Sequence, residues 1–233
     1  MKFLIVNADD FGYGAAINRG IVEAIDHGLV SSVGLMVNTP GTQEAVALAK
    51  ARPRVSVGLH VNFTNEAQRL LEFDDPPLCR AALREQFQRF CDLLGRKPSH
   101  LDSHQHVHRR RPCAPSFVEL AAEHAIPLRD RPPVVFKGGF YGQWEYGVSD
   151  PGRVSYEALE RILRNELTRG VYELACHPGY FDPGAEYVYH RDREDELRTL
   201  TDPRSRRLLE ELGVRAISYQ ELPEAVRALA DAG

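Results

Sequence analysis

The sequence has no long hydrophobic run and few cysteines, and each shortage excludes a class of protein. The amino-terminal stretch, residues 1–6, is too short for a signal-peptide core or for the roughly 20 apolar residues that span a bilayer. The cysteines lack CxxC spacing, which excludes a zinc ribbon and favours reduced thiols; they are Cys79, Cys91, Cys113 and Cys176. We therefore expect a cytoplasmic protein with no transmembrane segment.

An excess of one charge is missing as well. The chain has 29 basic and 33 acidic side chains, a net charge of −4, and its one dense basic run is residues 109–111. This composition disfavours a nucleic-acid backbone or an anionic membrane as the partner. With 233 residues, of which 43% are hydrophobic, the chain can form a complete core without disulfides or metal ions. We expect a single domain over residues 1–233.

Short runs rich in Val, Ile and Leu alternate with longer segments of helical period, which is typical of βα units around a parallel sheet. The expected strands are residues 3–6, 32–37, 55–59, 100–103, 127–129, 172–176 and 214–217. The expected helices are residues 15–27, 42–51, 81–94, 115–124, 155–169, 203–212 and 219–230. Residues 130–152 are interpreted as a long irregular loop. The number of strands is close to the eight of a closed βα barrel.

Polar side chains follow directly after four of the expected strands. Asp9 and Asp10 come after the first strand, His60 after the third, His104 after the fourth and His177 after a late one. The carboxyl ends of parallel strands form one rim, and binding sites are built on that rim. We therefore expect the four polar clusters to meet in one place.

The segment Asp102, His104, His106 and His108 concentrates titratable groups. Side chains two residues apart in an extended chain project to the same face, so these four would share one side. Because unpartnered polar groups are costly to bury, they must pair, bind a metal or point into solvent.

Imidazole nitrogens and a carboxylate suit Zn²⁺ and other divalent first-row metals, with positions left open for water and substrate. Asp10, His60 and His104 are the proposed ligand set. Spacing alone does not separate His104 from His106, or Asp10 from Asp9, and paired carboxylates after a strand also cap helices. His177 is either a structural residue before a Pro-Gly turn or a general acid that protonates a departing amine.

Four segments resemble one known family. They are NADDFG at 7–12, GLHVN at 58–62, HLDSHQHVH at 100–108 and CHPGY at 176–180. In these motifs, and in their order over nearly the whole chain, the sequence resembles the YdjC/ChbG-like carbohydrate deacetylases, relatives of the polysaccharide deacetylases. The resemblance implies an α/β fold, an irregular, TIM-barrel-like (β/α) barrel with parallel strands and outer helices. It also implies one divalent cation, Zn²⁺ or Mg²⁺, and hydrolytic removal of acetyl groups from N-acetylated sugars.

The resemblance also implies roles for individual residues. The metal ligands would be Asp10, His60 and His104; the base Asp9; the acid His177; and the residue that steadies the base Arg129. Gln105 stands where some similar proteins have a histidine, and by strand alternation it should face away from the ligands.

The expected partner is an N-acetylated saccharide or a glycolipid head group, and a homodimer stays open. The predicted substrate contacts are Asn62, Tyr141, Trp144 and Tyr180. The aromatic residues of the 130–152 loop would stack on a sugar, cover an apolar aglycone or pack back onto the barrel. Two alternatives are a metal-dependent phosphoesterase on the same rim, which would need a second cation, and a sugar-binding module without catalysis.

Overall fold

A computed structural model describes residues 1–64, 70–71, 74–184 and 188–232. Its described residues form a seven-stranded sheet in which every pairing is parallel. The order along the sheet is β4 (Leu101–Ser103), β3 (Ser56–Val61), β2 (Ser32–Leu35), β1 (Lys2–Phe11), β8 (Gly170–Cys176) and β5 (Val134–Lys137), and β9 (Val214–Ala216) also pairs with β1.

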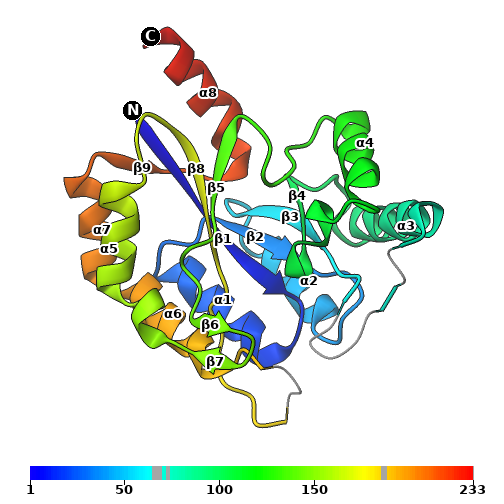
Figure 1. Cartoon of the computed structure of the whole chain (residues 1–233), viewed down its shortest axis with the longest axis horizontal. Coiled ribbons are helices and arrows are strands. Elements are labelled where there is room, and N and C mark those ends of the chain that lie inside the picture. Colours follow the sequence, from blue (N-terminus) through cyan, green and yellow to red (C-terminus); the bar gives the residue numbers. More distant parts are fainter. Residues whose placement is uncertain (65–69, 72–73, 185–187, 233) are drawn as a thin grey trace.

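Strand β1 is the centre of the sheet, as Figure 1 shows. Residues 3–11 of this strand are all buried, which explains the continuous apolar run of residues 3–6 in its first half. Strand β8 pairs along β1 from Lys2 to Ala8. Strand β8 occupies one edge of β1, and β9 and β2 share the opposite edge. Strand β9 pairs with residues 2–4 of β1, and β2 pairs with residues 7–11. The carboxyl end of β1 is thereby held between β2 and β8.

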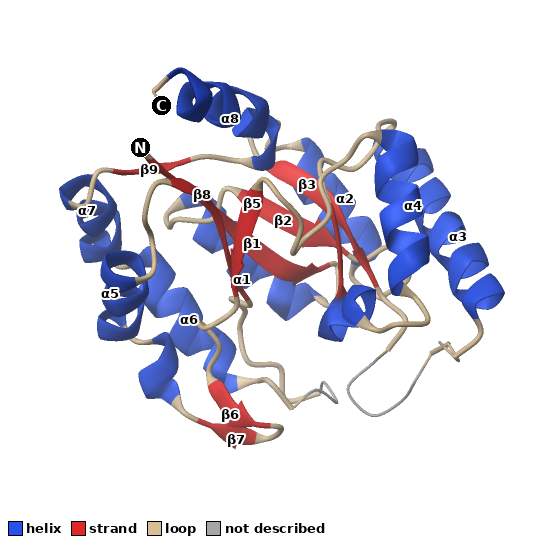
Figure 2. Cartoon of the chain, turned by 45° about the horizontal axis from the view of Figure 1, so that its top comes forward, coloured by secondary structure: helices blue, strands red, loops and turns tan. Residues whose placement is uncertain are grey.

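Helices enclose this sheet (Figures 1 and 2). They are α1 (Ala15–Asp26), α2 (Thr42–Lys50), α3 (Pro76–Leu94), α4 (Ala114–His124), α5 (Tyr156–Asn165), α6 (Arg191–Thr201), α7 (Pro203–Glu211) and α8 (Leu222–Asp231). Helices α3 and α4 lie together beside β4, whereas α5 and α7 lie together at the opposite side. Helix α8 lies near the amino terminus, away from the carboxyl ends of the strands.

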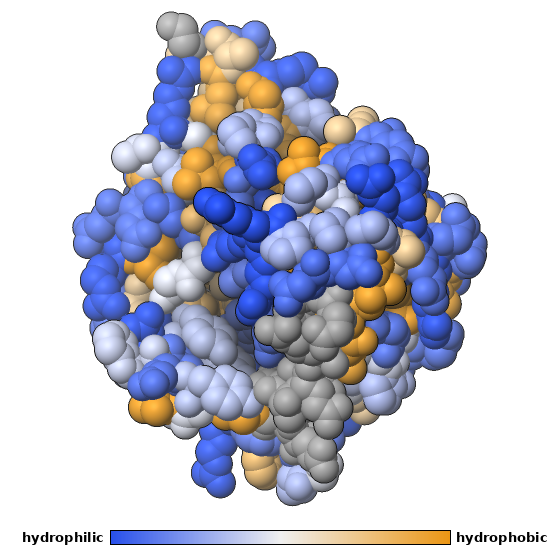
Figure 3. Space-filling view, turned by 45° about the vertical axis from the view of Figure 1, so that its right-hand side comes forward, coloured by the Kyte–Doolittle hydropathy of each residue, from blue (hydrophilic) through white to orange (hydrophobic). Residues whose placement is uncertain are grey.

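Amphipathic sequence explains why these helices pack where they do. In α5, Leu159, Ile162 and Leu163 are buried, and the Ser155 hydroxyl accepts a hydrogen bond from the Ala158 N–H at 3.2 Å, so Ser155 caps the helix. Polar residues predominate on the face shown in Figure 3, with apolar ones scattered among them. None of the helices in the described part of the chain is long and apolar enough to cross a bilayer.

The prediction of an irregular βα barrel with parallel strands and outer helices is confirmed. Two local predictions are wrong. Residues 127–129 make only a single β-bridge, between Leu101 and Leu128, and the next strand is β5. The stretch 130–152 is not one irregular loop, because it contains β5, the hairpin of β6 (Gln143–Glu145) and β7 (Val148–Ser149), and the start of the 3₁₀ turn Pro151–Val154.

The histidine-rich segment is also not extended as predicted. Strand β4 ends at Ser103, and His104–Arg109 form a 3₁₀ turn in which Gln105 and His106 have positive φ angles of 49° and 52°. Strand alternation therefore stops at Ser103, and the prediction that Asp102, His104, His106 and His108 share one face is wrong.

Candidate active site

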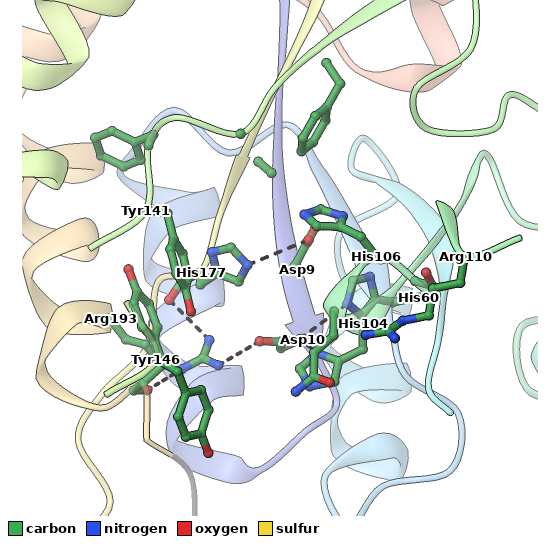
Figure 4. Close-up of a pocket in the computed structure, with 17 residues that line it drawn as sticks. Asp9, Asp10, His60, His104, His106, Arg110, Tyr141, Tyr146, His177 and Arg193 are labelled. Carbon is green, nitrogen blue, oxygen red and sulfur yellow. Dashed lines mark hydrogen bonds and ion pairs between the residues drawn. The ribbon is translucent and has the colours of Figure 1, made fainter. Parts of the chain in front are cut away.

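The carboxyl ends of β1, β3, β4 and β8 surround a cavity of about 540 Å³ (Figure 4). Acidic, imidazole and aromatic side chains line it, including Asp9, Asp10, His60, His104, His106, Phe136, Phe140, Tyr141, Tyr146, His177, Tyr189 and Arg193. The expectation that the four polar clusters meet on one rim is confirmed. Gln105 lines the cavity as well, so the prediction that it faces away is wrong; the left-handed turn redirects it.

Asp10, His60 and His104 lie together at the base of this cavity. One oxygen of the buried Asp10, Oδ1, is 3.0 Å from His104 Nδ1 and 3.4 Å from His60 Nε2. One ligand atom from each of the three residues lies within 4.8 Å of the others. Asp10 has a φ of 67°, a conformation that costs a non-glycine residue about 1–3 kcal/mol and is concentrated at functional sites.

The hydrogen bonds of His60 determine which of its ring nitrogens faces Asp10. Its Nδ1–H donates to Asp102 Oδ1 at 2.8 Å, which leaves Nε2 facing Asp10. Burial opposes a charge on His60, but Asp102 and Asp9 outweigh it and raise the pKa to about 10. A carboxylate oxygen only accepts, so each nitrogen facing it needs a proton or a shared cation. The donor set therefore fits a divalent cation.

Arg129 is fully buried beneath the cluster and contacts three carboxylates. Its guanidinium donates to both oxygens of Asp9, at 2.7 Å each, and contacts Asp102 at 2.7 Å and Glu173 at 2.6 Å. Burial would favour protonated Asp9, but the hydrogen bonds and charge of Arg129, together with the charges of His60 and His177, outweigh burial and lower the pKa, so Asp9 stays ionised.

A second group of potential ligands, Asp9, His60 and Asp102, lies around this guanidinium. Because Arg129 already contacts both carboxylates, a second cation there would be repelled by its positive charge. This removes support from the phosphoesterase alternative.

His177 lies across the cavity from the histidines of β3 and the 3₁₀ turn (Figure 4). Its Nε2 is 3.8 Å from Asp9 Oδ2, and its Nδ1 is 3.7 Å from Glu196 Oε1. Burial lowers the pKa of His177, but the carboxylates of Glu196 and Asp9 outweigh burial and raise it. The imidazole is therefore poised to carry a proton beside an ionised carboxylate.

Helix α6 supplies site residues that sequence reasoning missed. Besides Glu196, it carries Arg193, whose Nη2 is 2.7 Å from Asp10 Oδ2. The helix was missed because the face it buries includes Asp192, Arg193 and Glu196, so the usual apolar stripe is absent. A run of alternating charges is normally interpreted as an exposed surface.

Of the predicted substrate contacts, Tyr141 lines the cavity, where it stacks on Tyr189 with ring centroids 4.5 Å apart. Trp144 is 71% exposed and lies outside the lining. The Tyr180 hydroxyl bonds to Glu23, and the Asn62 side chain donates to Asn38, so these two also lie outside the lining that the described residues form.

The remaining histidines of the segment have different environments. His106 lines the cavity, edge-on to Phe136 with ring centroids 5.5 Å apart. His108 bonds through Nδ1 to Ser103 Oγ at 2.7 Å and approaches Asp130 at 3.4 Å. His108 therefore stabilises the turn, whereas His106 faces the site.

Comparisons with known proteins agree with this geometry. A family model described as "YdjC-like protein" matches residues 3–211. The chain is 34% identical to carbohydrate deacetylase 2 of Listeria innocua serovar 6a, over 95% of this chain and 99% of that protein. It is 33% identical to the chitooligosaccharide deacetylase of Serratia marcescens, also over 95% and 99% of the two chains.

Two solved structures share the fold. One is a putative cellobiose-phosphate cleavage protein of Enterococcus faecalis V583, with a TM-score of 0.76 and 24% identity over 95% of this chain and 98% of that one. The other is a family 4 carbohydrate esterase from Streptomyces lividans in complex with acetate, with a TM-score of 0.57 and 12% identity over 94% of each chain.

Proposed function

The chain belongs to the YdjC-like protein family, and we propose that it is a metal-dependent hydrolase that removes N-acetyl groups from amino sugars and releases acetate. The observation that carries the proposal is the pairing, in one cavity, of an Asp10–His60–His104 group whose ligand atoms are close enough to share a cation with a spare ionised carboxylate, Asp9. The names of the relatives, carbohydrate and chitooligosaccharide deacetylases, support the same reaction.

Asp10, His60 and His104 would hold one divalent cation. When bound, the cation would supply Lewis-acid polarisation of the acetamide carbonyl. Two imidazoles favour Zn²⁺ over Mg²⁺, which prefers an all-oxygen shell, so we propose Zn²⁺ as the better match.

Asp9 acts as the general base and His177 as the general acid. Asp9 is held by hydrogen bonds from both terminal nitrogens of the Arg129 guanidinium. It takes a proton from the attacking water while the oxygen of that water adds to the acetyl carbon. His177 gives its proton to the departing nitrogen, because an amine leaves far more readily than an amide anion. The products are acetate and a free amino sugar.

The substrate is an N-acetylated saccharide or the head group of a glycolipid. The aromatic wall supports this class, because sugar rings present apolar faces that stack on aromatic side chains. Tyr141 is the predicted contact that lines the cavity, and Tyr146 and Tyr189 line it as well.

An acetate-release assay tests the proposal directly. The purified protein is incubated with N-acetylglucosamine, its short oligomers and an N-acetylated glycolipid, each with Zn²⁺, with Mg²⁺ and with a chelator. We expect acetate and free amine in equal amounts from at least one substrate, loss of activity with chelator and recovery with metal. Binding of these sugars without acetate release would instead support a sugar-binding module.

Glu196→Gln tests the acid. Glu196 raises the pKa of His177, so removing its charge should lower that pKa. Activity requires protonated His177 and falls as the pH rises through its pKa, so the alkaline limb of the pH–rate profile should move to lower pH. Glu194→Gln, on the same helix but bonded to the Phe181 N–H, is the matched control and should leave the limb in place. An unshifted limb in Glu196→Gln would exclude this pairing.

A further inference from the structure

Arg193 is a charged residue inside the protein that the reaction scheme above does not use. Its side chain is 2% exposed. Its Nη2 donates to Asp10 Oδ2 at 2.7 Å, its Nη1 to the His177 carbonyl at 3.3 Å and its Nε to the Tyr189 carbonyl at 2.9 Å. Figure 4 shows the guanidinium between Asp10 and the wall that carries Tyr141 and His177.

Close backbone packing confines this side chain. A Cβ placed on Gly179 would lie 3.1 Å from Arg193 Cδ, and one placed on Gly20 would lie 2.4 Å from Gly179 Cα. The Gly179 N–H also donates to the Arg193 carbonyl at 3.3 Å. Gly20 of α1 therefore packs directly on Gly179, in the segment after β8, and Gly179 packs on Arg193, so the Arg193 side chain has little freedom to leave Asp10.

This arrangement divides the two oxygens of Asp10 between two tasks. Oδ2 accepts from Arg193, while Oδ1 faces His60 and His104. A carboxylate not restrained in this way can bind a cation through both oxygens and fill a position that water or substrate needs.

We propose that Arg193 is a positioning residue that restricts Asp10 to one-oxygen ligation and ties this ligand to the backbone of His177 across the cavity. The inference rests on the proposed function, since it takes Asp10 as a metal ligand. Arg193 differs from an ordinary structural support because its positive charge opposes a neighbouring cation while its hydrogen bond directs the ligand.

Arg193→Met tests this role, since methionine keeps much of the apolar volume but neither the charge nor the donors. We expect turnover of the metal-saturated enzyme to fall by roughly 10–100-fold, the usual effect of losing a partner of a metal ligand. Zn²⁺ affinity, measured by competition with a chromogenic chelator, should be equal or tighter, because a repelling charge is gone. The visible spectrum of bound Co²⁺ should change in intensity, since it reports coordination number and geometry.

Two companion variants keep the test decisive. Arg193→Lys retains the charge with one compact donor group and should lose less activity than Arg193→Met. If Arg193→Met does not fold, Arg193→Lys takes its place in the same measurements. Arg191→Met, at the exposed start of α6, is the control and should match the wild type.

Three results would overturn the proposal: unchanged turnover, weakened Zn²⁺ affinity with normal turnover at saturation, or an unchanged Co²⁺ spectrum. Failure of the proposed function is distinguishable, because the wild type itself would then bind no cation or release no acetate.

Discussion

Asp9→Asn should reduce the turnover of acetate release by roughly 10²–10⁴-fold, the range expected when a positioned base is removed, while bound metal stays near the wild-type amount. Asp9 lies outside the Asp10–His60–His104 group, so its charge is not needed to complete that donor set. Asparagine has nearly the same shape but cannot accept the proton of water. The measurement is the rate of acetate release together with metal content per chain.

The same network explains why Asp9, and not Arg129, is the residue to change. Arg129 contacts Asp9, Asp102 and Glu173, all buried, and removing it would leave these carboxylates without their partner. Breaking a buried ion pair from one side costs about 3–5 kcal/mol, so inactivity of an Arg129 variant would report unfolding as readily as catalysis. In Asp9→Asn, Arg129 keeps two carboxylate partners.

A control carboxylate makes the result specific. Asp130 accepts a hydrogen bond from Arg109 Nε and lies outside the cavity lining, so Asp130→Asn tests the general effect of neutralising a paired acid. It should leave turnover within the normal range. If Asp9→Asn retained turnover with its metal in place, another group would have to be the base.

Three of the residues that could be predicted from the sequence lie at, or directly after, the carboxyl end of a strand. Asp9, His60 and His177 are found in the cavity because parallel strands place their carboxyl ends on one rim. Alternation of apolar runs with helical segments located most strands, and it works because a parallel sheet is buried on both faces. The sequence therefore predicts the part of the site that lies on the sheet.

The other half comes from helix α6, and its contribution could not be deduced from the same rules. Arg193 and Glu196 face the site because Asp10 and the His177 N–H bond to them, and those partners lie more than a dozen residues away in sequence. Before the fold is known, such charges are indistinguishable from a solvated surface.

The conformation of the turn after β4 could not be predicted, for a different reason. Gln105 and His106 are consecutive residues with positive φ, a conformation that neither side chain favours and that local sequence seldom indicates. A local contact closes the turn, since the Ser103 hydroxyl accepts from the His108 N–H at 2.9 Å, and the contact of His104 with Asp10, at 3.0 Å, ties it to β1. The turn places His104 against Asp10 and leaves His106 elsewhere on the wall.

His104→Ala should lose the bound cation and, with it, acetate release. Among the described residues, the His104 side chain bonds only to Asp10, so the change removes a ligand without depriving any other carboxylate of a hydrogen bond. His60→Ala should also lose the cation, but it deprives Asp102 of a hydrogen bond and therefore lowers stability as well. Metal content per chain is the primary measurement, and the wild type should hold one equivalent.

His106→Ala is the matched control for this ligand assignment, because it removes an imidazole from the same turn and the same cavity wall. His106 belongs to neither of the potential ligand groups among the described residues, so its variant should keep the full metal content. Spacing in the sequence could not separate His104 from His106, and this pair of variants does. Full occupancy in His104→Ala together with metal loss in His106→Ala would reverse the assignment. Loss in both would mean that metal binding depends on the conformation of the whole turn and not on the His104 imidazole alone.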